Sequence, residues 1–407
     1  MANRESTRKD VPYGPDNPHP LSQLRTELVW EGKYDEYGNR REVDIAGCAM
    51  PLQKIETIDE PRSRAEAEKD QKTLFELQKQ SEKLGDFRNM LIWGDNKLTM
   101  ASLLTHFKGR IDLIYIDPPF DVGADFSMEV SVGESREVIK KDQSVLELVA
   151  YRDMWGKGAD SYLHMMFERL LIMRDLLSEK GFIYVHCDYR VQSMLRSILD
   201  EVFGKDNFLN EIVWRYEGPQ APSSIRFATK NDRILRYAKS ADHCLPGEMY
   251  FYEKIPESEA SYSQDESGKW FYTLPRGDYT DESIERLEKE GRIHRTRTGN
   301  VRIKYIVERT EGGFFLRRKK LADVWDDIPS LGHTANKEEN TGFDTQKPEA
   351  LIERIVLAST TPESVIADFF CGSGTTGAVA EKLGRRWIMS DLGRFAVHTS
   401  RKRLIEV

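Results

Sequence analysis

The 407-residue chain is long enough for two or three domains, and no apolar run in it approaches the ~20 residues of a membrane helix. The first ten residues lack the apolar stretch of a signal peptide. The four cysteines are too scattered for a disulfide framework or a zinc site. We therefore expect a cytoplasmic protein without a bound metal or a membrane partner. The net charge of −8 excludes a generic polyanion binder, which means that any surface for nucleic acid must be local.

Residues 1–58 are rich in Pro, Gly and charge without a sustained hydrophobic period, which predicts an N-terminal extension, and residues 59–88 predict an exposed helix that Gly85 ends. From residue 89 onward, apolar strands alternate with amphipathic helices. This alternation is typical of an α/β fold with a mostly parallel sheet. We expect strands at 89–93, 111–117, 182–188, 211–216 and 233–238, and helices at 97–106, 162–180 and 191–203, the second of which Gly181 should end.

The most informative strand runs from Ile111 to Asp117, where Pro118 and Pro119 stop it because they cannot donate to a sheet ladder. Open α/β sheets bind ligands at the carboxyl ends of such strands. There Asp117 and the carbonyl of Pro118 can accept both hydrogens of an exocyclic amine on a base, which localises the nitrogen lone pair and makes the nitrogen a nucleophile. Phe120 offers a ring on which an extruded base can stack. The alternative is an ordinary strand followed by a Pro-Pro turn with a surface acid.

Residues 121–150 carry Gly and mixed charge without a clear period, and they predict either a loop that closes over this site or a plain insertion. The methionines in the following helix fall on its apolar stripe, so we interpret them as core residues. His186, at the end of the next strand, is interpreted as a buried structural histidine rather than a catalytic one.

Residues 241–340 break the α/β rhythm and are aromatic, charged and rich in turns. Between Arg286 and Leu321 there are twelve Lys or Arg and four Glu, a basic tract in an acidic protein. Such a tract beside aromatic residues favours nucleic-acid binding over an ordinary solvated surface. The candidate DNA-binding residues are Arg295, Arg297, Arg302, Lys304, Arg317, Arg318, Lys319 and Lys320.

A second candidate site follows the predicted strand at 365–370, where Cys371-Gly372-Ser373-Gly374-Thr375-Thr376-Gly377 leads into a helix. Glycines let the backbone approach a ligand closely, and the helix N-terminus supplies free N–H groups. The next strand ends at Asp391. Nicotinamide dinucleotides and S-adenosylmethionine both use such a loop with an acid that holds the ribose. Only sixteen residues follow Asp391, too few for the second half that a dinucleotide needs, which favours S-adenosylmethionine.

Three segments together resemble a known family: Asp117–Phe120, then Asp344-Thr345-Gln346-Lys347-Pro348-Glu349, then Asp368–Thr376. In this order they are similar to the permuted β group of DNA amino-methyltransferases, which includes the modification subunits of type III restriction systems. One departure is Phe369, where many members carry proline.

The resemblance implies a Rossmann-like methyltransferase fold, circularly permuted, with a seven-stranded, mostly parallel sheet and helices on both faces. Its catalytic half would span residues 89–240 and its S-adenosylmethionine-binding half residues 341–407, with a target-recognition region inserted at 241–340. The implied catalytic residues are Asp117, Pro118, Pro119 and Phe120. The implied cofactor-binding residues are Asp95, Lys347, Asp368, Phe370, Cys371, Gly372, Gly374, Thr375, Thr376 and Asp391. Asp95 would face the cofactor adenine, although it also fits a helix N-cap.

The implied reaction is transfer of a methyl group from S-adenosylmethionine to adenine N6 of a base flipped out of double-stranded DNA, since Asp before Pro-Pro resembles the adenine-modifying members. The alternatives are a DNA cytosine N4-methyltransferase, an RNA adenine methyltransferase, a dinucleotide oxidoreductase and a non-catalytic DNA-binding subunit. The resemblance also leaves room for a homodimer and for a separate restriction subunit as partners.

Overall fold

The computed structural model describes residues 27–56, 88–119, 128–131, 138–141, 158–217, 225, 227–331, 339–343 and 345–407. The helix predicted at 59–88 and the loop predicted at 121–150 lie almost entirely outside these residues, and so do Phe120 and Asp344. Across the described part of the chain, no helix has the length and apolar character needed to cross a membrane.

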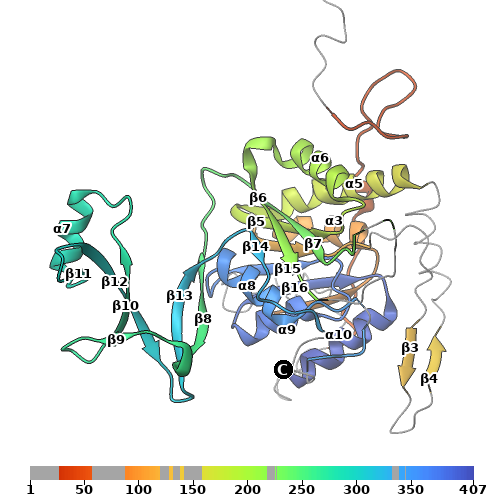
Figure 1. The fold of residues 1–407 in the computed structure, drawn as a ribbon. Coiled ribbons are helices and arrows are strands. Elements are labelled where there is room, and N and C mark those ends of the chain that lie inside the picture. Colours follow the sequence, from red (N-terminus) through yellow and green to blue (C-terminus); the bar gives the residue numbers. More distant parts are fainter. Residues whose placement is uncertain are drawn as a thin grey trace, which may run out of the picture.

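A mixed sheet forms the centre of the molecule (Figure 1). Its strands are, in spatial order, β1 (Met90–Trp93), β16 (Arg386–Asp391), β15 (Val365–Asp368), β2 (Ile111–Ile116), β5 (Leu177–Cys187), β7 (Asn231–Ala238), β6 (Phe208–Arg215) and β14 (Val324–Trp325). Only β7 runs antiparallel to its neighbours within this sheet. The mostly parallel sheet is therefore confirmed, and the two-residue strand β14 makes it eight-stranded instead of seven-stranded.

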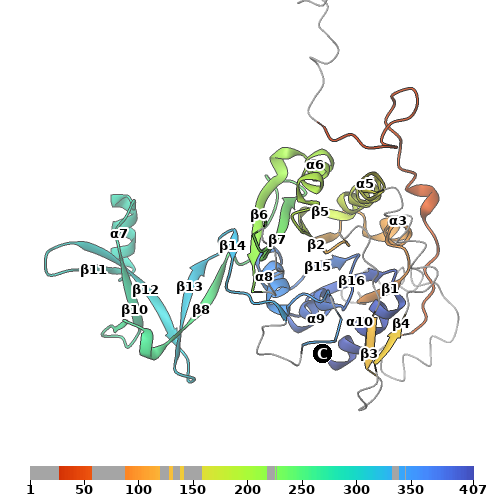
Figure 2. The same cartoon turned by 45° about the vertical axis from the view of Figure 1, so that its right-hand side comes forward.

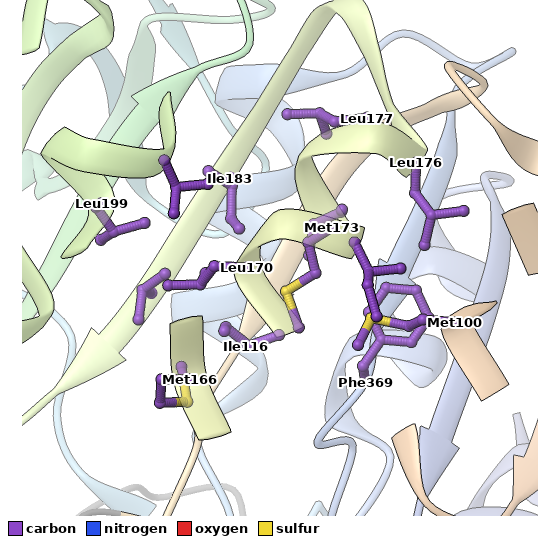
Figure 3. Packing of buried hydrophobic residues seen from close by; sticks show 14 of the residues in the cluster. Met100, Ile116, Met166, Leu170, Met173, Leu176, Leu177, Ile183, Leu199 and Phe369 are labelled. Atoms are coloured by element: carbon purple, nitrogen blue, oxygen red, sulfur yellow. The ribbon is translucent and has the colours of Figure 1, made fainter. Parts of the chain in front are cut away.

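Helices cover both faces of this sheet, as predicted. One face packs against α3 (Asn96–Phe107), α5 (Ala159–Leu176) and α6 (Gln192–Phe203), and the other against α8 (Glu349–Ser359) and α9 (Thr375–Lys382). The last helix, α10 (Arg394–Glu406), contacts α9. Figure 3 shows Met166, Leu170 and Met173 of α5 packed beside Ile116 of β2. All four are completely buried, which confirms that the α5 methionines are core residues.

One local prediction is wrong, because α5 ends at Leu176 and β5 begins at the next residue, well before Gly181. Gly181 instead lies inside β5, against the neighbouring strand β2. A Cβ at this position would lie 2.8 Å from the carbonyl oxygen of Asp112. The glycine is thus needed for close approach of two backbones, and this requirement leaves no periodic signal in the sequence.

A second, antiparallel sheet projects from the core as a separate arm, which β8 and β13 connect to it (Figures 1 and 2). Its strands are β8 (Tyr250–Pro256), β13 (Phe314–Lys320), β12 (Val301–Arg309), β10 (Trp270–Pro275) and β9 (Ser263–Gln264), with β11 (Ile293–Arg295) also paired to β12. Helix α7 (Asp281–Lys289) covers part of one face through Ile284 and Leu287. Smaller elements are the hairpin β3 (Met128–Ser131) and β4 (Val138–Lys141), and the short helices η2 (Ala46–Cys48), η4 (Lys205–Asn207) and η5 (Glu257–Glu259).

The order of the core strands brings together the two motifs that are far apart in the sequence. Strand β15 lies parallel to β2, with Ile366 opposite Leu113 and Ala367 opposite Ile114. Because both strands point the same way, Asp117 after β2 and residues 370–374 after β15, here named the glycine loop, emerge at the same edge of the sheet. This edge is the place where open α/β sheets bind ligands.

Candidate active site

Asp117 lies directly after β2 with its side chain only 15% exposed. One carboxylate oxygen, Oδ2, accepts a hydrogen bond from the Nζ of Lys347. The other, Oδ1, is buried and has no hydrogen-bond partner among the described residues. A buried acceptor without a donor is costly in a folded protein. We interpret Oδ1 as an acceptor whose donor comes from a ligand.

Lys347 links the Asp117 carboxylate to the glycine loop. Its Nζ reaches Asp117 from the segment before α8, and its backbone carbonyl accepts a hydrogen bond from the Thr375 hydroxyl at 3.3 Å. Thr375 is the first residue of α9 and also accepts a hydrogen bond from Arg403 at 2.9 Å. The direct contact with Asp117 was not anticipated, since the sequence resemblance assigns Lys347 to the cofactor.

The glycine loop is held in place by Asp391 at the end of β16. Its carboxylate accepts hydrogen bonds from the backbone N–H of Gly372 at 2.9 Å and of Gly393 at 2.8 Å. Gly372 has a φ of 49°, and a Cβ there would lie 3.4 Å from the Phe343 ring. Because each carboxylate oxygen can accept more than one hydrogen bond, Asp391 can hold the loop and still accept from a ribose hydroxyl.

Gly374 allows the loop to turn into α9 against α10. Its φ of 75° lies in the left-handed region, and a Cβ would meet the Oγ of Ser400 at 2.7 Å and the Cα of Ser400 at 3.0 Å. Ser400 in turn donates its hydroxyl to the carbonyl of Gly372 at 2.9 Å. Both predicted glycines therefore sit where a side chain would clash or strain the backbone.

Asp368, the last residue of β15, is a buried carboxyl at the base of this loop. It accepts hydrogen bonds from the Thr376 hydroxyl at 2.5 Å and from the Phe370 N–H at 3.0 Å. Burial, followed by the charges of Asp117 and Asp391, outweighs these bonds and raises the pKa of Asp368 to about 7. The predicted loop residue Cys371 is also buried, and burial raises the pKa of its thiol well above the ordinary value.

Asp95 caps α3 and forms an ion pair. Its Oδ1 accepts from the backbone N–H of Lys97 at 2.8 Å and of Leu98 at 3.2 Å, which confirms the N-cap. Its Oδ2 accepts from Arg169 at 3.0 Å. The predicted contact with the cofactor adenine stays a prediction.

Sequence reasoning missed the buried polar groups around Asp95. Arg169 also donates to the side chain of Asn96, and Asn96 donates to the carbonyl of Phe369 at 2.9 Å, just before the glycine loop. In the sequence Arg169 is one charged residue within an amphipathic helix, and nothing there indicates that it is buried. Fully buried His186 contacts the Tyr115 hydroxyl at 3.0 Å and Asp232 at 3.2 Å, which agrees with a structural histidine.

The eight cationic residues predicted to bind DNA all lie on the arm, but their surroundings differ. Three of them form ion pairs: Arg295 with Glu288, and Arg317 and Lys319 with Glu253. Three contact neutral groups: Arg302 the side chain of Thr273, Lys304 the ring of Phe271 and Arg318 the ring of Tyr250. Arg297 and Lys320 are exposed.

The carboxyl edge of the sheet fits the predicted cofactor, S-adenosylmethionine. Asp117, Asp368 and Asp391 gather there, and their mutual repulsion contributes to the raised pKa of Asp368. A ligand that carries sulfonium and ammonium charges would relieve this repulsion. No group of His, Cys, Asp and Glu in the described residues could hold a metal ion.

Comparison with known proteins identifies the family to which this chain is related. A model of the family described as DNA methylase matches residues 111–402. The type II methyltransferase M.EcaI of Enterobacter cloacae is 32% identical over 346 residues, which cover 77% of this chain and 69% of that protein. The StyLTI Mod subunit, from a type III restriction-modification enzyme of Salmonella typhimurium, is 26% identical over 71% of this chain, but the match spans only 49% of that subunit. Among solved structures, the M1.HpyAVI–SAM complex covers 77% of this chain and 98% of its own, with 17% identity and a TM-score of 0.42.

Proposed function

Because the chain belongs to the DNA methylase family, whose cofactor is S-adenosylmethionine, we propose that it methylates the exocyclic N6 amine of adenine in double-stranded DNA. One observation supports this most directly. Among the described residues, the buried Oδ1 of Asp117 has no donor, and this oxygen lies at the sheet edge where the glycine loop also emerges. An amine N–H of a flipped base is a donor of the right kind for that oxygen.

In the proposed mechanism, Asp117 Oδ1 accepts one hydrogen of the adenine amine and the Pro118 carbonyl accepts the other. Two acceptors outside the plane of the base localise the nitrogen lone pair and orient it for attack. Phe120 would stack on the base. When bound, S-adenosylmethionine supplies an electrophilic methyl group on a sulfonium. Most of the rate gain then comes from holding the amine in the correct position and orientation.

Lys347 acts in this mechanism as a positioning residue for Asp117. Its ammonium group occupies Oδ2, so the carboxylate keeps one orientation and directs Oδ1 toward the base. The ion pair is largely buried, with Lys347 14% and Asp117 15% exposed, so water screens it weakly. The Lys347 carbonyl also accepts a hydrogen bond from Thr375. Lys347 therefore connects the catalytic carboxylate of Asp117 to the start of α9, next to the glycine loop.

The residues that would hold the cofactor are those of the glycine loop and the acidic residues that hydrogen-bond to it. Asp391 would accept from the ribose, and the backbone at Gly372 and Gly374 would allow close approach. The half-buried Phe370 lies in the same loop, and the first N–H groups of α9, which follow the loop, have no acceptor within the helix. Asp368 accepts a hydrogen bond from the Thr376 hydroxyl and thereby holds the start of α9 next to this loop.

Adenine is preferred over cytosine because aspartate stands before Pro-Pro, as in the adenine-modifying members that the sequence resembles. The relation to a Mod subunit supports a restriction subunit as a further partner, and a homodimer remains part of the proposal. The arm at residues 250–320 is assigned to target recognition on account of its basic tract.

The direct test is the identity of the methylated base. Purified protein is incubated with isotopically labelled S-adenosylmethionine and either unmethylated genomic duplex DNA or matched RNA, and the digested nucleosides are analysed by mass spectrometry. We expect labelled N6-methyladenine from DNA only. Label in N4-methylcytosine would overturn the choice of base, and label in RNA alone would overturn the choice of substrate.

A further inference from the structure

The arm sorts its charged residues onto two faces. In an antiparallel pair, residues opposite each other share a face, and alternate residues along a strand point to opposite faces. The register places Arg318 opposite Tyr252, and Leu316 opposite both Lys254 and Glu308. Counting alternate residues from these pairs gives one face that we name the open face. Its cationic residues are Lys254, Arg302, Lys304, Arg318 and Lys320.

The opposite face, here named the paired face, holds cations that already have anionic partners. Arg317 and Lys319 share Glu253, which lies directly opposite Arg317 in the register. Arg309 pairs with Glu257 at 2.9 Å. Each of these three cations therefore has an anionic partner within the arm, and two carboxylates offset two of the three positive charges.

The open face has no such compensation. None of its five cations forms an ion pair within the part of the chain that the structure describes. The strands contribute a single carboxylate to this face, Glu308, and the turn before β10 adds Asp265 near Lys304. The face also exposes apolar and aromatic surface, since Tyr252 is 51% and Ile306 47% exposed. Uncancelled cations mixed with exposed aromatic rings are typical of a surface that binds nucleic acid.

We infer that duplex DNA docks on the open face of the arm, and that the paired face holds the arm in shape without contacting DNA. This inference rests on the proposed function, and it assigns unequal roles to residues that are adjacent in the sequence. Arg318 and Lys320 contact DNA, whereas Arg317 and Lys319 do not. It also adds Lys254 and Tyr252, which lie outside the basic tract, to the DNA surface. A two-stranded antiparallel ribbon such as β8–β13 is one of the elements that the major groove of DNA admits.

The test compares two triple variants that each remove three positive charges from the arm. The open-face variant is Lys254→Gln, Arg318→Gln and Lys320→Gln, and the matched control is Arg309→Gln, Arg317→Gln and Lys319→Gln. Binding to duplex DNA is measured by fluorescence anisotropy at several salt concentrations, and S-adenosylmethionine binding by calorimetry reports that the core is intact.

We expect the open-face variant to lose roughly 10- to 100-fold in affinity near physiological salt, with the slope of log affinity against log salt reduced by about 2 to 3. The control should lose less than about threefold and keep its slope. An equal or larger loss in the control would overturn the inference, as would tighter binding of the wild-type protein to single-stranded RNA than to duplex DNA. Wild-type protein that transfers no methyl group to DNA would instead refute the proposed function. The two failures are thus distinguishable.

Discussion

At the carboxyl edge of the core sheet, Asp117 and Asp368 are largely buried, and fixed side chains and backbone groups hold them in place. In the arm, pairs such as Arg295 with Glu288 are more than half exposed on both sides. Charged side chains are therefore in different environments in the two regions, buried at the sheet edge and exposed in the arm. Burial makes each charge at the sheet edge depend on its neighbours, whereas water screens the charges of the arm. Buried, fixed groups fit the catalysis that we propose at the sheet edge, and exposed, screened charges fit the reversible DNA binding that we propose for the arm.

The strongest way to break this comparison is to remove the central carboxylate. Asp117→Ala should lower the rate of methyl transfer by roughly a thousandfold or more, since the amine loses an oriented acceptor in a buried site. S-adenosylmethionine affinity, measured by calorimetry, should stay within about threefold of the wild type. Turnover near the wild-type rate would show that Asp117 is not the catalytic acceptor.

Variants of Lys347 should have the next largest effect on the rate of methyl transfer. They also distinguish whether Lys347 positions Asp117 or binds the cofactor. Lys347→Met leaves the buried Asp117 carboxylate without its partner, so we expect kcat to fall roughly 10- to 100-fold while the Kd for S-adenosylmethionine changes little. Lys347→Arg should restore part of the rate. A weaker cofactor Kd with unchanged kcat would instead support the cofactor-binding role that the sequence resemblance suggests.

The glycine loop can be tested with a matched pair of variants. Gly374→Ala puts a Cβ at 2.7 Å from Ser400 Oγ in a left-handed conformation, whereas Gly384→Ala has a similar φ of 67° and open space around the Cβ. The second variant should cost about 1 kcal/mol and the first roughly 1–3 kcal/mol more. Urea unfolding measures both. Equal costs would mean that α10 yields easily at Ser400.

Because the pKa of Asp368 is raised in the folded protein, the stability of the protein should depend on pH. Its pKa of about 7 in the folded protein exceeds the ordinary value of 3.8, so between these pH values only the folded state retains the proton. Stability from this group is complete below about pH 4 and is lost as pH rises through 7, by up to roughly 4 kcal/mol. Asp368→Asn should remove this loss, so its stability advantage over the wild type should grow from pH 4 to pH 8 in urea unfolding. Parallel pH curves for the two proteins would contradict the assignment.

The smallest effect is expected in the arm. Arg295→Gln breaks an ion pair whose side chains are 55% and 51% exposed, and the free energy of unfolding should change by less than about 1 kcal/mol. A loss of several kcal/mol would mean that ion pairs in the arm are as interdependent as those at the sheet edge.

The sequence alone predicted seven of the eight strands of the core sheet and most residues at their carboxyl ends, but it missed β14 and the start of β5. Local signals suffice for this, because a buried strand is a short apolar run, and Pro118 or Gly372 marks where it must stop or turn. The cap at Asp95 was likewise predictable from its place before a helix. The family resemblance came from the order of three such segments, and the match to residues 111–402 agrees with it.

Only the tertiary structure decided which side chains face each other. The contact of Lys347 with Asp117, the burial of Arg169 and the position of Gly181 against β2 join segments far apart in the chain, and no local pattern encodes such pairs. The basic tract is the plainest case. Its composition predicts a charged surface, but the pairing of β8 with β13 determines which cations meet Glu253 and which have no ion-pair partner among the described residues, because neighbouring residues in a strand point to opposite faces.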